Sequence, residues 1–136
     1  MSMGFLMETS GAAVWRGLMV MSAIDRLTRQ VAWAPLDWLI VDTPPGTGDT
    51  HLSLAQTLPV AGALLVTGPG SAAYQVTRRG ANMFKKLGVP LAGLVANMAT
   101  IDCSKCGHTT DLASTSSEKL AEELGKIIWL VIVTGE

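Results

Sequence analysis

Apolar residues form short continuous runs along the chain. Three of the runs are rich in β-branched and other apolar side chains, namely residues 38–42 (WLIVD), 62–68 (GALLVTG) and 91–98 (LAGLVANM). A parallel strand that is covered on both faces has this continuous pattern, whereas a half-exposed strand alternates. The three runs therefore predict three buried parallel strands. A fourth apolar run, in residues 126–136, predicts a last strand.

Three further segments have the spacing or the boundary residues of helices. Apolar residues three and four apart predict the first helix, which we expect to end near Pro35. Gly88 and Gly125 close the second and third helices at their carboxyl ends, where glycine is common. The residues that define the three helices are Val20, Ile24, Leu27 and Val31, then 72–87, then 114–124.

The order of these elements predicts an α/β domain. Strands that alternate with helices form a mostly parallel sheet, and ligands bind beyond the carboxyl ends of its strands. At 136 residues the chain is long enough for one core and short for two, so we expect a single domain over residues 1–136. The residues that follow each predicted strand are therefore the candidates for a site.

Composition narrows the classes of function. Ten basic and eleven acidic residues give a net charge of -1, which provides no field for nucleic acid, so we expect no nucleic-acid partner. A hydrophobic content of 49% and a mean hydropathy of +0.37 indicate a globular chain. No apolar run reaches the ~18 residues of a membrane span. The first residues contain no basic segment of the kind found in transit peptides, which leaves a cytoplasmic location open.

A carboxylate and a glycine-rich loop follow the first predicted strand. Asp42 ends the apolar run, and residues 43–49 read TPPGTGD. Mg²⁺ binds one or two carboxylates together with phosphate oxygens. Gly46 and Gly48 would let backbone N–H groups approach an anion closely. A turn acid at Asp42 and a helix cap at Asp49 would explain the same residues, so spacing alone leaves both interpretations open.

Cys103 and Cys106 are the two cysteines of the chain, and they lie three positions apart in sequence. This CxxC spacing favours metal or redox chemistry in a reducing compartment over a secreted disulfide framework. A zinc or iron–sulfur site takes four ligands, so one pair fills half a site and two chains would complete it. Zinc, an iron–sulfur cluster and a thioredoxin-like redox pair all fit the spacing. His108 is expected to be a loop residue.

Several motifs in one order resemble a known family. The segments DTPPGTGD (42–49), ANMFKKLGVPLAGLVANM (81–98) and CSKC (103–106) are similar to the Mrp/NBP-type family of P-loop ATPases that carry iron–sulfur clusters. The resemblance runs from about Met1 to Gly125. It implies a partial P-loop NTPase fold of the deviant Walker A, MinD/Mrp-like kind, which works as a homodimer.

The resemblance also implies roles for individual residues. Asp42 would take the Walker B role toward Mg²⁺, and Asn97 would contact the adenine base of ATP, although an asparagine that closes a strand would also fit there. Cys103 and Cys106 would hold a [4Fe-4S] cluster between two subunits. The residues that would sense the terminal phosphate are Gly46, Thr47, Gly48 and Asp49.

Residues 1–6 (MSMGFL) and 15–24 (WRGLMVMSAI) are most similar to a mitochondrial branch of the family that assists assembly of respiratory complex I. This implies a location in the mitochondrial matrix and iron–sulfur client apoproteins, complex I subunits among them. The 136 residues contain no GxxxxGK[ST] phosphate loop, so we expect a truncated domain whose ability to hydrolyse ATP is uncertain. The alternative is a non-catalytic fragment that binds zinc or a partner through its cysteines.

Overall fold

The computed structural model describes residues 2, 18–112, 114–125 and 128–134, so most of the opening stretch that carries part of the resemblance lies outside the described residues. The chain divides into two compact units, residues 1–59 and residues 60–136. Each unit is described by itself. The expectation of a single domain stays a prediction.

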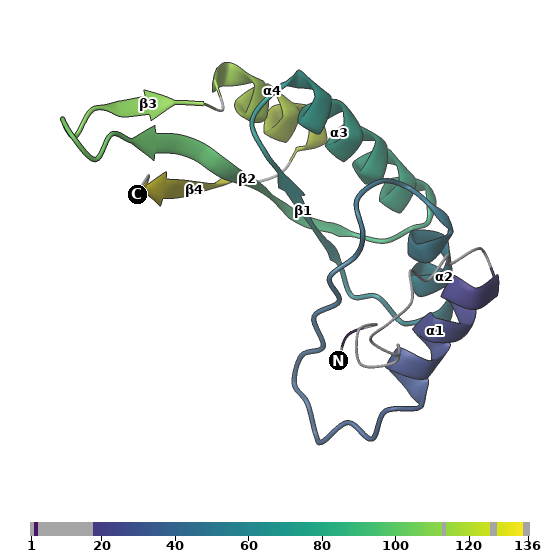
Figure 1. Cartoon of the computed structure of the whole chain (residues 1–136). Coiled ribbons are helices and arrows are strands. Elements are labelled where there is room, and N and C mark those ends of the chain that lie inside the picture. The colour runs from purple at the N-terminus through teal and green to yellow at the C-terminus, as the bar shows by residue number, and fades with distance from the viewer. Residues whose placement is uncertain (1, 3–17, 113, 126–127, 135–136) are drawn as a thin grey trace. The chain divides into compact units, whose positions relative to one another are not determined.

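The first unit contains two helices that lie in contact, α1 (Leu18–Arg29) and α2 (Asp49–Thr57) (Figure 1). The guanidinium of Arg29 donates a hydrogen bond of 3.2 Å to the carbonyl oxygen of Thr57 and so joins their carboxyl-terminal ends. The apolar stripe predicted for this helix is confirmed within α1, because Ile24 is buried and Val20 and Leu27 are at least half-buried. Val31, its last predicted member, lies beyond the end of the helix.

Helix α1 ends at Arg29, six positions before the proline that was expected to mark its end. The indole Nε1 of Trp33 donates a hydrogen bond of 3.1 Å to the carbonyl oxygen of Thr28, and the backbone N–H of Trp33 donates to the carbonyl oxygen of Val31 at 2.9 Å. The first bond occupies a carbonyl group in the last turn of the helix, which would otherwise lack a partner within the helix. The chain therefore leaves the helix before it reaches Pro35.

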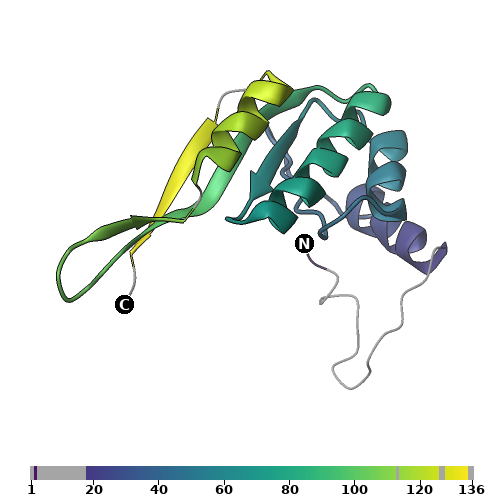
Figure 2. The same cartoon turned by 90° about the horizontal axis from the view of Figure 1, so that it is seen from above.

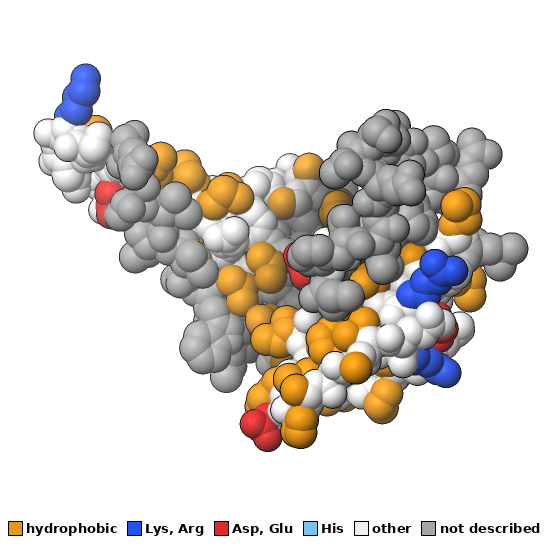
Figure 3. Space-filling model, turned by 60° about the horizontal axis from the view of Figure 1, so that its bottom comes forward, with side chains coloured by type: hydrophobic (Ala, Val, Ile, Leu, Met, Phe, Trp, Pro, Cys, Tyr) orange, Lys and Arg blue, Asp and Glu red, His pale blue; other side chains and the backbone are white. Residues whose placement is uncertain are grey.

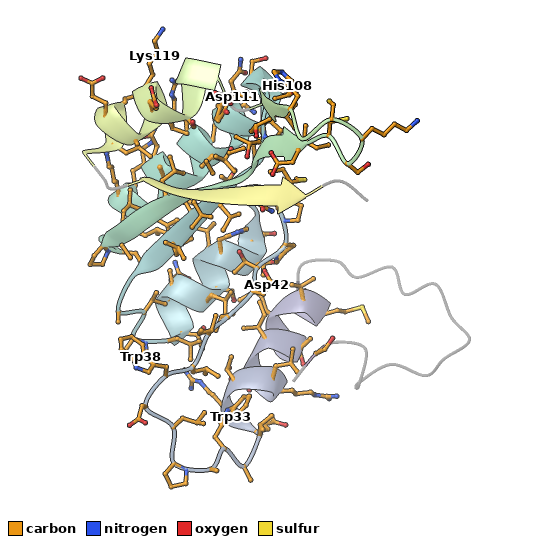
Figure 4. All side chains as sticks on the ribbon, turned by 90° about the vertical axis from the view of Figure 1, so that its left-hand side faces the viewer. Trp33, Trp38, Asp42, His108, Asp111 and Lys119 are labelled. Atoms are coloured by element: carbon orange, nitrogen blue, oxygen red, sulfur yellow. The ribbon has the colours of Figure 1, made fainter. Side chains whose placement is uncertain are left out.

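The strand predicted at residues 38–42 is wrong. No described strand pairs with this segment, and the side chains of Trp38 and Ile40 are 80% and 89% exposed. Figure 4 shows Trp38 and Asp42 on the irregular connection between α1 and α2. A strand exists only through hydrogen bonds to a neighbouring strand. An apolar run predicts burial, but it does not supply that neighbour.

The second unit is built around one mixed sheet, in which β2 is central (Figure 1). β1 and β4 both pair with β2 in parallel, and β3 pairs with it antiparallel. The expected α/β fold with a mostly parallel sheet is confirmed, as is the predicted last strand. The bounds of the strands are β1 Ala63–Thr67, β2 Leu91–Asp102, β3 Thr109–Asp111 and β4 Ile128–Thr134.

Two helices, α3 (Ser71–Lys86) and α4 (Ser114–Leu124), lie side by side on one face of this sheet (Figures 1 and 2). The core between them and the sheet consists of Leu65, Tyr74, Ala81, Leu91, Leu94, Leu120, Ala121 and Leu124. Side chains of β1 that point the other way, Leu64 and Val66, are 57% and 60% exposed. Figure 3 shows hydrophobic side chains open to solvent in orange.

Strand β2 continues four residues past its predicted end, to Asp102. Its register with β4 shifts between Ala96 and Thr100, so that three residues of β2 lie opposite one residue of β4. Within this irregularity Met98 has a φ of +55°, in the left-handed region. Beyond it, β2 and β3 form a hairpin that extends past the ends of α3 and α4 (Figures 1 and 2). Among the described residues no helix is both long and apolar enough to cross a membrane.

We expect Leu94→Ala to lower the free energy of unfolding of the second unit by about 2–5 kcal/mol, because it leaves a cavity at a fully buried position. Leu64→Ala is the matched control on the adjacent strand. Its side chain is mostly exposed, so the change should stay within about 0.5 kcal/mol. Urea denaturation followed by far-UV circular dichroism measures both. Equal losses would show that the core does not centre on Leu94.

Candidate functional site

Both cysteines lie in the turn that joins β2 to β3. The backbone N–H of Cys103 donates a hydrogen bond of 2.9 Å to the carbonyl oxygen of His108, and the carbonyl oxygen of Cys103 accepts one of 2.8 Å from the N–H of Gly107. Gly107 has a φ of +69°, which side chains other than glycine rarely adopt. The chain can therefore reverse directly after Cys106, and both thiols stay in one short turn.

The sulfur of Cys103 is a hydrogen-bond acceptor within this turn. The backbone N–H groups of Lys105 and Cys106 donate to it, as does the Cys106 side chain, and these bonds lower the pKa of the Cys103 thiol from its usual value. Burial opposes them only weakly, because both cysteines are free and exposed. Hydrogen bonds to the charged form favour the thiolate, which is the form that binds metals.

The turn supplies two thiols and no third ligand. Among the described residues, no three His, Cys, Asp or Glu side chains lie close enough together to hold a metal ion. His108 and Asp111 lie on the same hairpin (Figure 4), but they do not complete a site with the cysteines. The expectation that His108 is a loop residue is confirmed, since it lies between β2 and β3. Among the described residues, the turn therefore supplies two of the four ligands that a zinc or iron–sulfur site takes.

The loop predicted to sense the terminal phosphate lies immediately before α2 in the first unit. Asp42 is exposed and lies on irregular backbone, not at the tip of a strand. Gly46 has a φ of +103°. Gly48 is the N-cap of α2, so Asp49 is the first residue of the helix and not its cap, although its charge there suits the helix dipole. These loop residues, including Thr47, are exposed to solvent.

Asn97 lies within β2 and not at its end, contrary to the prediction. Its side-chain Oδ1 accepts a hydrogen bond of 3.0 Å from the backbone N–H of Met98. The Cε of Met98 lies 3.7 Å from the position that a Cβ on Gly68 would occupy. The irregularity of β2 and the loop after β1 therefore meet at the carboxyl edge of the sheet, where ligands bind in folds of this class.

The predicted residues thus fall into two groups. Asp42 and the residues 46–49 belong to the first unit, whereas Asn97 and the two cysteines lie on or directly after β2 in the second. Sequence reasoning missed the hydrogen bond of 2.6 Å between the hydroxyl of Thr109 and the carboxylate of Asp102, beside the cysteine turn. No sequence signal pointed to it, because the contact depends on the register of the hairpin.

The partial α/β fold, with its parallel core strands and a glycine-rich loop before a helix, is that of a P-loop NTPase. The ParA family model, described as NUBPL iron-transfer P-loop NTPase, matches residues 1–133, so the chain belongs to this family. The resemblance inferred from the sequence motifs is thereby confirmed.

Relatives named for iron–sulfur cluster transfer match most of the chain. It is 51% identical over 125 residues to the iron-sulfur cluster transfer protein NUBPL of Mus musculus, covering 91% of this chain and 39% of the mouse protein. It is 48% identical over 126 residues to the iron-sulfur cluster carrier protein of Pseudomonas fragi, covering 92% and 44%. The chain therefore spans about two fifths of the length of these relatives.

Two further comparisons agree with this family. The chain is 48% identical over 108 residues to the iron-sulfur protein required for NADH dehydrogenase, mitochondrial, of Arabidopsis thaliana, covering 79% of this chain and 34% of the plant protein. A solved structure of a nucleotide-binding protein from Archaeoglobus fulgidus in complex with ADP superimposes with a TM-score of 0.71 at 29% identity. It covers 88% of this chain and 49% of that one.

We expect the alkylation of Cys103 by iodoacetamide to reach half its maximal rate at a lower pH in the folded chain than in the chain unfolded in urea. The folded turn lowers the pKa of this thiol, so a larger thiolate fraction exists at any given pH below that of the free thiol. Lys105 lies between the cysteines, so tryptic peptides separate them for mass spectrometry. Identical pH profiles in both states would contradict the hydrogen bonds to sulfur.

Proposed function

We propose that this chain binds an iron–sulfur cluster as cargo through Cys103 and Cys106 and takes part in its transfer to client apoproteins. The observation that carries the proposal is the turn itself, which holds two exposed free thiols in one short loop closed by backbone hydrogen bonds at Cys103, Gly107 and His108. Thiolates are the ligands that hold iron–sulfur clusters. The family to which the chain belongs and the names of its relatives support the same cargo.

The cluster is proposed to be a [4Fe-4S] cluster held between two copies of the chain. Such a cluster takes four cysteine thiolates, and the chain has two cysteines. A twofold symmetric homodimer would bring the same turn from each copy to one axis and complete the ligand set. The exposure of both cysteines is consistent with this arrangement.

Transfer to a client requires that thiolates of the client replace those of the carrier. The cysteine turn is accessible because it lies at the end of a hairpin that extends past α3 and α4 (Figure 2). The backbone N–H groups of Lys105 and Cys106 would stabilise the Cys103 thiolate as the cluster leaves. The turn is therefore suited to releasing a bound cluster to a client.

We further propose that nucleotide binding regulates the carrier. The exposed carboxylate of Asp42 would bind Mg²⁺ through water, and the backbone of Gly46, Thr47, Gly48 and Asp49 would face the terminal phosphate of ATP. Asn97 would contact the base. Hydrolysis additionally needs a phosphate-binding loop, and the 136 residues contain no GxxxxGK[ST] sequence.

The clients and the compartment follow from the relatives. The plant relative is named as required for NADH dehydrogenase and as mitochondrial, and the mouse relative is a cluster transfer protein. We therefore propose apoproteins of respiratory complex I as clients and the mitochondrial matrix as the location. Bacterial carriers are similar at 48% identity, so the cargo chemistry does not itself require that compartment.

Anaerobic reconstitution with iron and sulfide should give a broad absorption band near ~400 nm and about four irons per dimer, because four thiolates complete the cluster. The double variant Cys103→Ala, Cys106→Ala should lose both. Ser104→Ala in the same turn is the matched control and should load normally. A colourless protein that binds one zinc ion through the same cysteines would favour the alternative, a non-catalytic metal-binding fragment.

Asp42→Asn should abolish the Mg²⁺-dependent part of nucleotide binding and leave cluster loading unchanged, because the two sets of residues belong to different units. Asp37→Asn makes the same change of charge on the same connection and serves as the control. Binding of a fluorescent ADP analogue with and without Mg²⁺ measures the effect. If Asp42→Asn reduced nucleotide binding and cluster loading equally, Asp42 would be a residue that supports folding.

A further inference from the structure

We propose that Asp102 and Thr109 are positioning residues for the cysteine turn. The hydrogen bond between their side chains holds the β2–β3 hairpin in the register in which the Cys103 N–H bonds the His108 carbonyl oxygen and closes the turn. The inference rests on the proposed function, because it assumes that Cys103 and Cys106 bind a metal. Neither residue belongs to the proposed ligand set.

The backbones of Asp102 and Thr109 do not hydrogen-bond to each other in the β2–β3 ladder. The N–H of Leu112 donates to the carbonyl oxygen of Ala99 at 2.8 Å, and the N–H of Cys103 donates to that of His108 at 2.9 Å. Hydrogen-bonded and non-hydrogen-bonded pairs alternate along an antiparallel ladder. The pair of Asp102 and Thr109 is therefore of the non-hydrogen-bonded kind, in which side chains lie closest.

Burial does not fix the register of this hairpin. All three residues of β3 are exposed, so a slip by one residue would bury no less apolar surface than the observed pairing. Only three residue pairs join β2 and β3, the last of them Asp102 with Thr109. In such a short, exposed ladder, specific side-chain pairs contribute a large share of the preference for one register.

The side-chain bond has the geometry of a strong hydrogen bond. The Oγ1 of Thr109 donates to Oδ1 of Asp102 at 2.6 Å, within the range of hydroxyl-to-carboxylate bonds. Threonine is β-branched, so few rotamers of its side chain compete with the one that makes the bond. The pair thus supplies at this position the cross-strand hydrogen bond that the backbone does not.

The position of the pair connects it to the cysteines. Asp102 directly precedes Cys103, and Thr109 directly follows His108, so this is the last pair before the turn closes. If it loosens, the bond between the Cys103 N–H and the His108 carbonyl lies at the end of a frayed hairpin. Metal binding would then have to order the turn, which lowers the affinity.

The test measures cobalt binding, with Co²⁺ alone as the probe, to the full chain under reducing and anaerobic conditions. Thr109→Val removes the donor without changing the shape and should raise the Kd for Co²⁺ about fivefold, as expected for one net hydrogen bond. Thr109→Ser retains the hydroxyl and should restore binding. Thr110→Val, one position along on the opposite side of the same strand, is the matched control and should bind as the unchanged chain does.

A double-mutant cycle separates a specific pair from general loss of structure. Asp102→Ala should match Thr109→Val, and the double variant should be no weaker than either single variant, because the same bond is lost once. Hydrogen exchange of the Cys103 and Gly107 amides should accelerate in Thr109→Val, while the exchange of the β1 amides and the melting temperature stay unchanged.

The inference would be overturned by unchanged Co²⁺ binding by Thr109→Val, by additive losses in the double variant, or by an equal loss in Thr110→Val. Co²⁺ binding that does not depend on Cys103 and Cys106 would overturn it as well. If the unchanged chain binds Co²⁺ through these cysteines but takes up no iron–sulfur cluster, the proposed function fails while the positioning role stands.

Discussion

Backbone hydrogen bonding to β2 is the constraint on which the second unit depends. Every other described strand pairs with β2, and none of them pairs with another. Its first half belongs to the core, where Leu91 and Leu94 are buried, and its second half leads directly to Cys103. The strand that organises the sheet therefore also carries Asn97 and positions the cysteine turn. A change in the path of β2 would move both of these candidate sites together.

The irregularity at residues 97–99 lets the first part of β2 belong to the core and its last part form the hairpin that ends in the cysteine turn. Left-handed backbone at a residue such as Met98 costs roughly 1–2 kcal/mol, so its surroundings must hold it in place. The side chain of Asn97 accepts the Met98 N–H, and the Met98 side chain lies against Gly68. Bulges of this kind bend a strand and often lie beside functional sites. Here the bulge separates the helix-covered part of β2 from the exposed hairpin.

The sequence predicted helices and strands well where burial of apolar side chains forms them. It predicted them poorly where hydrogen bonding to a neighbouring strand is required. β1 and α3 were predicted within a residue or so, because their apolar residues pack in one core with Leu94. Residues 38–42 are equally apolar, yet no described strand pairs with them. The extension of β2 to Asp102 was missed for the same reason, since pairing with β3 and β4 forms it. Spacing revealed the cysteine pair, but the register that holds its turn was not visible in the sequence.

An incomplete and exposed ligand set has a physical consequence for what the turn can hold. A structural metal site is usually closed by four ligands of one chain, and the ion then contributes to folding. This turn contributes two cysteines and is closed by backbone hydrogen bonds at Cys103, Gly107 and His108. For the proposed cargo, the affinity then depends on how firmly these bonds and the hairpin register hold the two thiols, because ordering a loose turn would use part of the binding free energy.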